Sequence, residues 1–441
     1  MHSLLARSAV MIALPAALSA CSSTSDGNRN PAPEAPPSLA PVLTPTPVFD
    51  GRLHDLTLRP DSQPGDWRVL GLLENGSGFA VADIQLSVWL EDPSGEKLAE
   101  ATVLPALAHL GPGEVTPFEA QFQGIGAVTG VEARVLLARR APIQRAEPLI
   151  SQPEVLVGED GSTLLLGLIS NPGSLPVAID GLAYLGMSSG EEARALALAL
   201  HAPGWLEAGV SSPFLARAAG SPEELRWVAF VDAQEQVEVL QPGVSLSGPP
   251  RLQLTAQGLP FAVGTLVNSS EQARRAALLL VVRYEDQALS VSSLASPFPI
   301  GPGEQLPFGQ ADFPGLSLRV AELGLDPAAL TLEAQVDPRA SEPFPDHRNQ
   351  LEVRIESFET VGSAVFLRGA VTNPHSMSLS RPSLYAALST TEGELLTAGW
   401  RELAARLAGA ERLEFVVDLP FPAAGDLSMA EFDVVAYGLG P

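Results

Sequence analysis

The chain has 441 residues, 46% of them hydrophobic, so it can bury several cores and is expected to form two to four domains. Its 26 Lys and Arg residues face 51 Asp and Glu residues, a formal charge of −25. Such an acidic surface repels phosphate backbones, which argues against nucleic acid as a partner. The single cysteine excludes an intramolecular disulfide and a cysteine-rich zinc site.

The first twenty residues have the pattern of a cleaved export signal. Arg7 precedes an apolar stretch, residues 9–18, that is too short to span a bilayer as a permanent helix. Leu18-Ser19-Ala20-Cys21 then resembles the lipobox of bacterial lipoproteins. The resemblance implies cleavage after residue 20 and lipidation of Cys21, which leaves a mature chain with 25 basic and 51 acidic residues, a formal −26. The alternative is a plain signal peptide, residues 1–20, with an incidental cysteine.

Residues 21–48 are expected to form a disordered tether behind the lipidated cysteine. They hold seven prolines among small and polar residues and too few large apolar side chains for a core. As polyproline II at ~3.1 Å per residue, the segment would reach roughly 80 Å.

A short motif, Gly-x-x-x-Asn, recurs four times at steps of 96, 97 and 105 residues. The pattern is typical of a strand that ends at a turn, because Asn tolerates left-handed backbone angles and its side chain can bond to the turn. The glycine is expected to allow a close approach or a bulge. The copies end at the structural turn residues Asn75, Asn171, Asn268 and Asn373.

A second motif follows each asparagine at nearly constant distance. It is a glycine-containing turn and then a strand with one inward-facing phenylalanine, which lies 43, 43, 40 and 42 residues after the asparagine. The four phenylalanines are Phe118, Phe214, Phe308 and Phe415.

Strand patterns fill the space between these motifs. Residues 84–90 and 351–355 alternate apolar and polar side chains, and further strands are predicted at 131–137, 225–231, 277–284, 330–336 and 432–437. We therefore predict an all-β fold of four tandem immunoglobulin-like β-sandwiches at 49–142, 143–247, 248–341 and 348–441. Residues 191–201 and 400–410 are rich in Ala and Leu, so short helices stay open as an alternative there.

Repeats 1 and 3 share further residues. An aromatic and acidic strand end precedes a turn at 89–92 and at 284–286, and Gly-Pro-Gly-Glu precedes the phenylalanine strand at 111–114 and at 301–304. With the Gly-x-x-x-Asn run, this order resembles the FxLYD and related immunoglobulin-like modules of exported bacterial lipoproteins. The resemblance implies extracytoplasmic tethering or interaction without a known shared ligand.

One motif points to catalysis. Gly186-Met187-Ser188-Ser189-Gly190 matches the Gly-x-Ser-x-Gly elbow of hydrolases, which makes Ser188 the candidate nucleophile of an atypical envelope hydrolase. The alternative is a hairpin turn, because Gly95, Gly190 and Gly393 follow the repeat asparagines by 20, 19 and 20 residues. An elbow also needs a parallel sheet, so we expect the turn.

Other candidate groups are weaker. The six histidines show no metal-ligand spacing, and the acidic pairs at 91–92, 159–160 and 285–286 could hold calcium between domains or be solvated turn residues. Trp89 is a candidate exposed contact, because its position in the alternation points it away from Ile84 and Leu90. No catalytic, cofactor-binding or metal-binding residue is assigned.

These features predict a lipid-anchored, exported, non-enzymatic protein of the bacterial cell envelope. Its expected work is binding or tethering a protein or envelope polymer through sheet edges and grooves between domains. The alternative is a structural spacer in an envelope assembly. Ser22 after Cys21 favours the outer membrane in diderm bacteria by family analogy.

Overall fold

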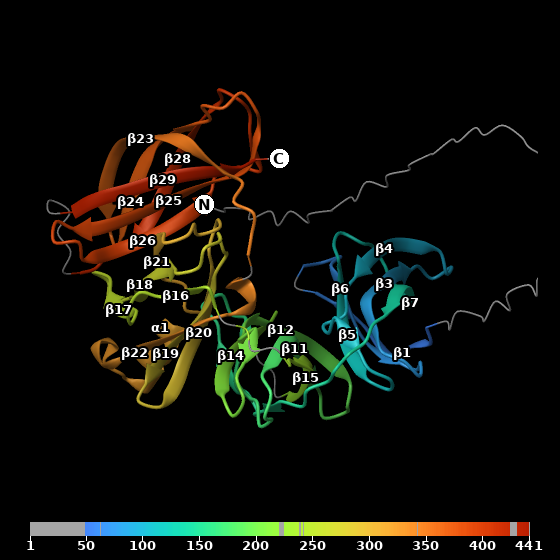
Figure 1. Ribbon diagram of the computed structural model, residues 1–441. Coiled ribbons are helices and arrows are strands. Elements are labelled where there is room, and N and C mark those ends of the chain that lie inside the picture. The colour runs from blue at the N-terminus through green and yellow to red at the C-terminus, as the bar shows by residue number, and fades with distance from the viewer. Residues whose placement is uncertain are drawn as a thin grey trace, which may run out of the picture. The chain divides into compact units, whose positions relative to one another are not determined.

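The computed structural model of the protein describes residues 49–61, 63–219, 225–237, 240, 242–341, 343–423 and 430–440 (Figure 1). The predicted signal peptide, the predicted lipidation site Cys21 and the predicted tether lie outside the described residues. The fold is all-β, built of antiparallel sheets with a sandwich arrangement, which confirms the predicted fold class. The predicted boundaries between four domains stay a prediction.

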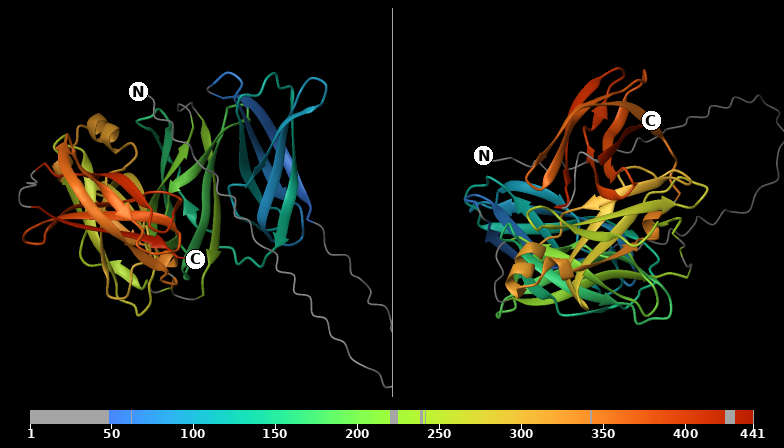
Figure 2. Two further views of the ribbon diagram at one scale, coloured as in Figure 1. Left: turned by 90° about the horizontal axis from the view of Figure 1, so that it is seen from above. Right: turned by 90° about the vertical axis from the view of Figure 1, so that its left-hand side faces the viewer.

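The strands form four groups in chain order, and Figure 2 shows the same groups by colour from two further sides. The first group makes two sheets, in the orders β1-β2-β6 and β4-β3-β5, and β7 also pairs with β3. Its strands are β1 Gly51–Pro60, β2 Trp67–Asn75, β3 Val81–Glu91, β4 Lys97–Val103, β5 His109–Leu110, β6 Val115–Phe122 and β7 Gly130–Arg140.

The second group forms one sheet in the order β13-β11-β12-β14-β10-β8, with β15 paired to β11 and β9 to β10. Its strands are β8 Leu149–Ile150, β9 Glu154–Val157, β10 Thr163–Ser170, β11 Val177–Met187, β12 Ala193–His201, β13 Trp205–Leu206, β14 Ser211–Ala218 and β15 Arg226–Glu235.

The third group makes two sheets, β16-β18-β17 with β21 on β18, and β20-β19-β22. Its elements are β16 Val244–Leu246, β17 Arg251–Leu254, β18 Pro260–Asn268, β19 Ala277–Tyr284, β20 Gln287–Ala295, β21 Gln305–Gln310, helix α1 Leu316–Leu323, the 3-10 turns Pro327–Ala329 and Arg339–Ser341, and β22 Thr331–Val336.

The fourth group is a sheet in the order β26-β25-β29-β23-β24-β28, with β27 paired to β25. Its strands are β23 Arg348–Val361, β24 Ala364–Thr372, β25 Leu379–Thr390, β26 Leu395–Glu402, β27 Arg406–Leu407, β28 Arg412–Pro420 and β29 Ala430–Leu439. In the described part of the chain, no helix is both long and apolar enough to cross a membrane.

The two repeated sequence motifs pair with each other in space. Each motif glycine lies opposite a motif phenylalanine across two antiparallel strands, and the phenylalanine ring covers the glycine. A Cβ atom on Gly71 would lie 2.5 Å from the Phe118 ring, so only glycine fits there. The four pairs are Gly71 with Phe118, Gly167 with Phe214, Gly264 with Phe308 and Gly369 with Phe415. The predicted close approach is confirmed.

Each motif asparagine is buried and ties two turns together. The Nδ2 group of Asn75 donates to the carbonyls of Phe79, Leu110 and Gly111, and its Oδ1 accepts from the N–H of Ser77. Asn171 and Asn373 make the same three Nδ2 bonds, and Asn268 makes two of them, with distances between 2.7 and 3.3 Å. In each copy Oδ1 accepts from the backbone N–H two residues further on. None of the four has a positive φ, so the expected left-handed backbone is wrong, and the side chain alone explains the residue.

Three hairpins close with the same four-residue turn. The left-handed position belongs to Gly95, Glu191 and Gly393, with φ of 80°, 61° and 82°. Each lies 20 residues after its repeat asparagine. The expected match at Gly190 is therefore wrong by one residue, since Glu191 takes the strained backbone that glycine takes in the other two hairpins.

Most of the two segments left open as helices, residues 191–201 and 400–410, is strand in the structure: 193–201 lies in β12, 400–402 in β26 and 406–407 in β27. β12 pairs with β11 and β14, and β26 and β27 pair with β25. Ladder pairing and burial outweigh the helix propensity of Ala and Leu. Within the described residues, helix α1 lies between β21 and β22 and was not predicted. Its signals are Leu316, Val320 and Leu323 at helical spacing between Gly315 and Gly324, both left-handed.

Several strands bury both faces, because neighbouring groups pack against each other. β25 directs Leu384, Ala386 and Leu388 into its own core, and directs Tyr385 and Ala387 into a cluster with third-group residues. β19 and β10 meet through a cluster that includes Leu164, Leu166, Leu279 and Val281. β2 and β11 meet through a cluster that includes Leu70, Ala183 and Leu185. The strand groups therefore share apolar contacts at all three junctions.

Candidate functional site

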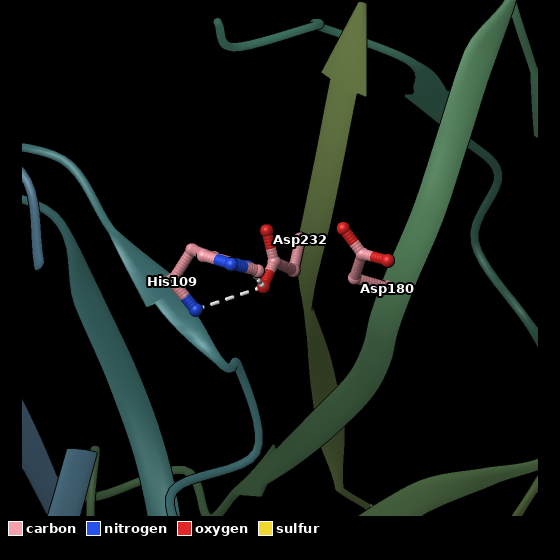
Figure 3. A group of neighbouring side chains, drawn as sticks. All are labelled: His109, Asp180 and Asp232. Carbon is pink, nitrogen blue, oxygen red and sulfur yellow. Dashed lines mark hydrogen bonds and ion pairs between the residues drawn. The ribbon is translucent and has the colours of Figure 1, made fainter. Parts of the chain in front are cut away.

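A cluster of polar side chains joins the first strand group to the second. His109 comes from β5, Asp180 from β11 and Asp232 from β15 (Figure 3). Each residue offers one nitrogen or oxygen atom, and these three atoms lie within 4.8 Å of one another. Within the described part of the chain, this is the cluster of histidine and carboxylate side chains that is close enough to be considered as a metal site. The strand pairing of β11 with β15 brings the two aspartates together, and β5 supplies the histidine.

Asp232 is fully buried, and its carboxylate accepts hydrogen bonds from His109 and Arg145. Oδ2 accepts from both the backbone N–H and Nδ1 of His109 at 2.9 Å, while Oδ1 accepts from Nη1 of Arg145 at 2.6 Å. Because a carboxylate only accepts, this geometry places a proton on Nδ1 of His109.

Arg145 completes this partly buried network from the segment between β7 and β8. Its Nε donates to Glu114 at 2.9 Å, and its Nη2 donates to the carbonyl of His109 at 2.7 Å. Burial lowers the pKa of the Arg145 guanidinium, but the bonds to Glu114 and Asp232 outweigh burial and raise the pKa overall. The arginine therefore stays charged between two carboxylates.

Asp180 is paired on its other side. Its Oδ2 accepts from Nε2 of Gln234 at 2.9 Å, and its Oδ1 accepts from Nη2 of Arg339 at 2.6 Å. Arg339 also donates to the carbonyls of Ile179 and Gly204. The side chain of Asp180 thus links the second strand group to the segment that follows β22.

These bonds decide what the cluster can do chemically. A divalent cation between His109, Asp180 and Asp232 would have to displace Gln234 and would lie beside two guanidinium groups that already neutralise the aspartates. The arrangement therefore works as an ion-pair network that holds strand groups together, and not as a metal centre.

Two grooves open beside this network, and residues 104–106 line both of them. One has a volume of about 500 Å³ and is lined by His109, Asp180 and Leu137 among others. The other, of about 440 Å³, is lined mainly by aliphatic side chains with Glu119 and Asp180. Burial raises the pKa of the Glu119 carboxyl, although Gln121 and Arg68 offset part of this shift. Leu104, which lines both grooves, is 68% exposed.

Ser188 lies in the hairpin turn between β11 and β12. Its Oγ accepts from the backbone N–H of Glu192, and the turn closes through Ser188 and Glu191. The strands on both sides belong to an antiparallel sheet, whereas a hydrolase elbow follows a strand of a parallel one. No hydrogen bond in the described residues joins the Ser188 hydroxyl to a histidine or carboxylate side chain.

The other candidate residues lie apart from the network. Trp89 is half-buried on β3, where its Nε1 donates to Glu91 and the ammonium of Lys97 lies 4.6 Å from the ring centre. Asp92 accepts from Ser94 and Glu96, and these bonds lower its pKa. Asp160 bonds to Ser162 in the same manner. The acidic pairs do not form a three-ligand group within the described ranges.

The residues of the network were missed from the sequence. His109 and Asp232 are 123 residues apart, and no spacing rule joins them. The one local sequence signal for this network was the Gly-Pro-Gly-Glu turn, because its Glu114 accepts a hydrogen bond from Arg145.

No protein-family model matches the chain, and no curated protein matches it.

Proposed function

We propose that this protein is an exported lipoprotein whose β-sandwiches bind or tether a protein or envelope polymer outside the cytoplasm. The observation that carries the proposal is Leu18-Ser19-Ala20-Cys21, placed at the end of a short apolar stretch in a chain with no other cysteine. The proline-rich residues 22–48 then separate the anchor from the folded residues. The outer membrane is the proposed location if the source is diderm.

The fold supports binding more than catalysis. An all-β arrangement of sandwiches offers sheet edges and grooves between strand groups as contact surfaces. The grooves beside Leu104 combine exposed aliphatic side chains with a few carboxylates, as binding surfaces do. Ser188 is held in a turn, so we propose that the protein is not an enzyme.

A structural spacer is the second candidate. The observation that favours it is that apolar clusters span all three junctions between strand groups. Such shared contacts suit a rigid element better than a flexible string of domains.

The anchor is tested by replacing Cys21. The Cys21→Ala variant should remain uncleaved or leave the detergent phase, because the lipid acceptor is missing. The matched Ser22→Ala variant should mature and partition like the wild type. If Cys21→Ala still matures and partitions into detergent, the anchor is disproved.

The choice between binding and spacing is tested by crosslinking in native membranes and identifying what is captured. A stable stoichiometric complex favours the spacer, and a transient one favours recognition. Leu104→Asp should reduce capture if the grooves make the contact, whereas Leu136→Asp, at another exposed leucine, on β7, should not. Equal capture by both variants would show that the grooves do not contact the captured partner.

A further inference from the structure

The two Gly-Pro-Gly-Glu turns have the same internal geometry. In the first, Oε2 of Glu114 accepts from the N–H of Gly111 at 2.6 Å. In the third strand group, Oε2 of Glu304 accepts from the N–H of Gly301 at 2.6 Å. Each bond holds the carboxylate over its own turn, so its other lone pairs face away from the turn.

Glu114 forms an ion pair with an arginine of the strand group that follows. The backbone of Arg145 pairs with Gln234, next to the end of β15, so Arg145 belongs to the second group by its main chain. Its side chain reaches back to Glu114 in the first group, at 2.9 and 3.0 Å from Nε to the two carboxylate oxygens. Asp232 binds the other side of the guanidinium.

Glu304 forms an ion pair with an arginine of the following group in the same way. Arg348 begins β23, and its backbone pairs with Leu439 at the end of β29, so it belongs to the fourth group. Its Nη1 lies 2.9 and 3.1 Å from the carboxylate oxygens of Glu304 in the third group. Asp346 binds the other side of the guanidinium at 2.8 Å, and the Tyr437 ring lies 4.9 Å away.

The two sites therefore agree in four respects. In each, an arginine at the start of one strand group pairs its backbone with the last strand of that group. Its side chain bonds to the turn glutamate of the preceding group and to a second carboxylate. We call this arrangement the arginine lock; its residues are Glu114, Arg145 and Asp232 at the first site and Glu304, Arg348 and Asp346 at the second.

The junction between the second and third groups is built differently. Val210 stands where the other turns have Glu114 and Glu304. Long-range ion pairs from later segments hold this junction instead, from Arg319 on α1 to Glu154 at 2.6 Å and from Arg339 to Asp180 at 2.6 Å. The lock thus occurs at alternate junctions, and the turn sequence Gly-Pro-Gly-Glu occurs in alternate groups.

We propose that the folded chain is two copies of a two-sandwich unit, and that in each copy the arginine lock fixes the angle between the two sandwiches. The first unit comprises the first and second strand groups, and the second unit comprises the third and fourth. Two charge-assisted bonds in a partly dry site resist rotation better than an exposed ion pair does. The pair of sandwiches is then the rigid element of the molecule.

The test measures one distance across each lock, in the full mature chain, as a report on the angle between the two sandwiches. Spin labels are attached to cysteines introduced by Ser94→Cys and Ser189→Cys for the first unit, and by Asp286→Cys and Thr391→Cys for the second, all at exposed turns. Pulsed distance measurements should give narrow distributions in the parent protein. Arg145→Gln should broaden only the 94–189 distance, and Arg348→Gln only the 286–391 distance.

Glutamate variants make the test specific to the lock. Glu304→Gln should broaden the 286–391 distance as Arg348→Gln does, and the double variant should broaden it no further, because both changes break the same contact between the third and fourth groups. Arg412→Gln, which removes an exposed ion pair with Glu356 inside the fourth group, should leave the distance unchanged. Hydrogen exchange at the start of β23 should become about tenfold faster in Arg348→Gln.

Unchanged distances in Arg145→Gln and Arg348→Gln, with folding retained, would overturn the proposal. Broadening of both distances by either single variant would also overturn it, because the two locks would then not be independent. If Arg145→Gln fails to fold, through the buried Asp232, Glu114→Gln replaces it, since that change leaves the Arg145 bond to Asp232 in place.

Discussion

At the scale of single residues, the repeated asparagine is the clearest case of a side chain that determines structure. It is buried in all four copies, and its amide group replaces the water that the two turns would otherwise bind. The residue before it differs in each copy, namely Glu74, Ser170, Val267 and Thr372. A role in the turn explains the repeat better than a ligand site.

We predict that Asn75→Ala lowers the free energy of unfolding by about 2 kcal/mol, because three carbonyls and one N–H lose their partner inside the protein. Asn349→Ala, which removes one bond from a partly exposed residue, should cost less than about 0.5 kcal/mol. Denaturant unfolding of residues 49–441 measures both. Unchanged stability in Asn75→Ala together with lost partner binding would make these turns the functional site.

Ala410 holds a left-handed backbone, with φ of 61°, where the first three groups have Gly113, Gly209 and Gly303. A Cβ atom in this region costs about 1 kcal/mol or more, and glycine removes the cost. Ala410→Gly should therefore raise the free energy of unfolding by about 0.5 to 1 kcal/mol. The matched change Ala408→Gly, at an exposed position without positive φ, should lower it slightly. A lower thermal midpoint for Ala410→Gly than for the wild type would contradict the assignment.

His201 makes the junction between β12 and β20 sensitive to acid. Its Nδ1 accepts from the N–H of Ser293 at 3.0 Å, so Nδ1 must be unprotonated there. Burial lowers the pKa of His201, and the charge of Asp312 offsets part of this shift. The neutral ring is therefore favoured by folding. Its contribution to stability is complete above the ordinary pKa of 6.5 and is lost as the pH falls below that value.

We predict that the wild type loses more stability between about pH 7.5 and 5.5 than His201→Gln does, by at most about 1.4 kcal/mol per pH unit. Glutamine can still accept the Ser293 bond without titrating. Parallel urea titrations at the two pH values give the comparison, and identical slopes for wild type and His201→Gln would refute it.

At the scale of elements, the pairing of Gly-x-x-x-Asn with the phenylalanine strand builds each sandwich. The register places glycine under the phenylalanine ring and the asparagine at the end of the same strand. The stability cost of replacing the glycine should therefore depend on whether the phenylalanine is present.

Gly264→Ala should lower the free energy of unfolding by about 2 kcal/mol, because its Cβ would lie 2.6 Å from the Phe308 ring. In a Phe308→Leu background the same change should cost clearly less, because the ring is gone. Gly248→Ala, in a bend of the same group with open space around it, should be neutral. Additive costs in the double variant, read from denaturant midpoints, would show that the ring and the glycine do not interact.

The sequence predicted these elements better than it predicted their partners. Motif spacing gave the strands and the turns, because glycine, asparagine and phenylalanine act within one group. The run from Leu278 to Val282 showed apolar side chains without alternation, which indicates that both faces are buried. Which strand covers the second face depends on contacts between groups, and no local pattern encodes them.

At the scale of the whole molecule, two kinds of contact join the strand groups. Apolar clusters cross each junction, and arginines are placed beside buried or half-buried carboxylates. In a chain with 51 acidic residues, each such arginine removes a like-charge repulsion as it forms a bond. The pairing of His109 with Asp232 across 123 residues could not be predicted, because it exists only after two groups have docked.

The proposed anchoring of the folded sandwiches to a membrane by a lipid on Cys21 is tested most directly by the mass of the mature amino terminus. Protein extracted from its native membrane is digested, and the terminal peptide is measured by mass spectrometry. We predict a peptide that begins at Cys21 and carries a thioether-linked diacylglyceryl group. A peptide that begins at another residue, or one that begins at an unmodified Cys21, would contradict it.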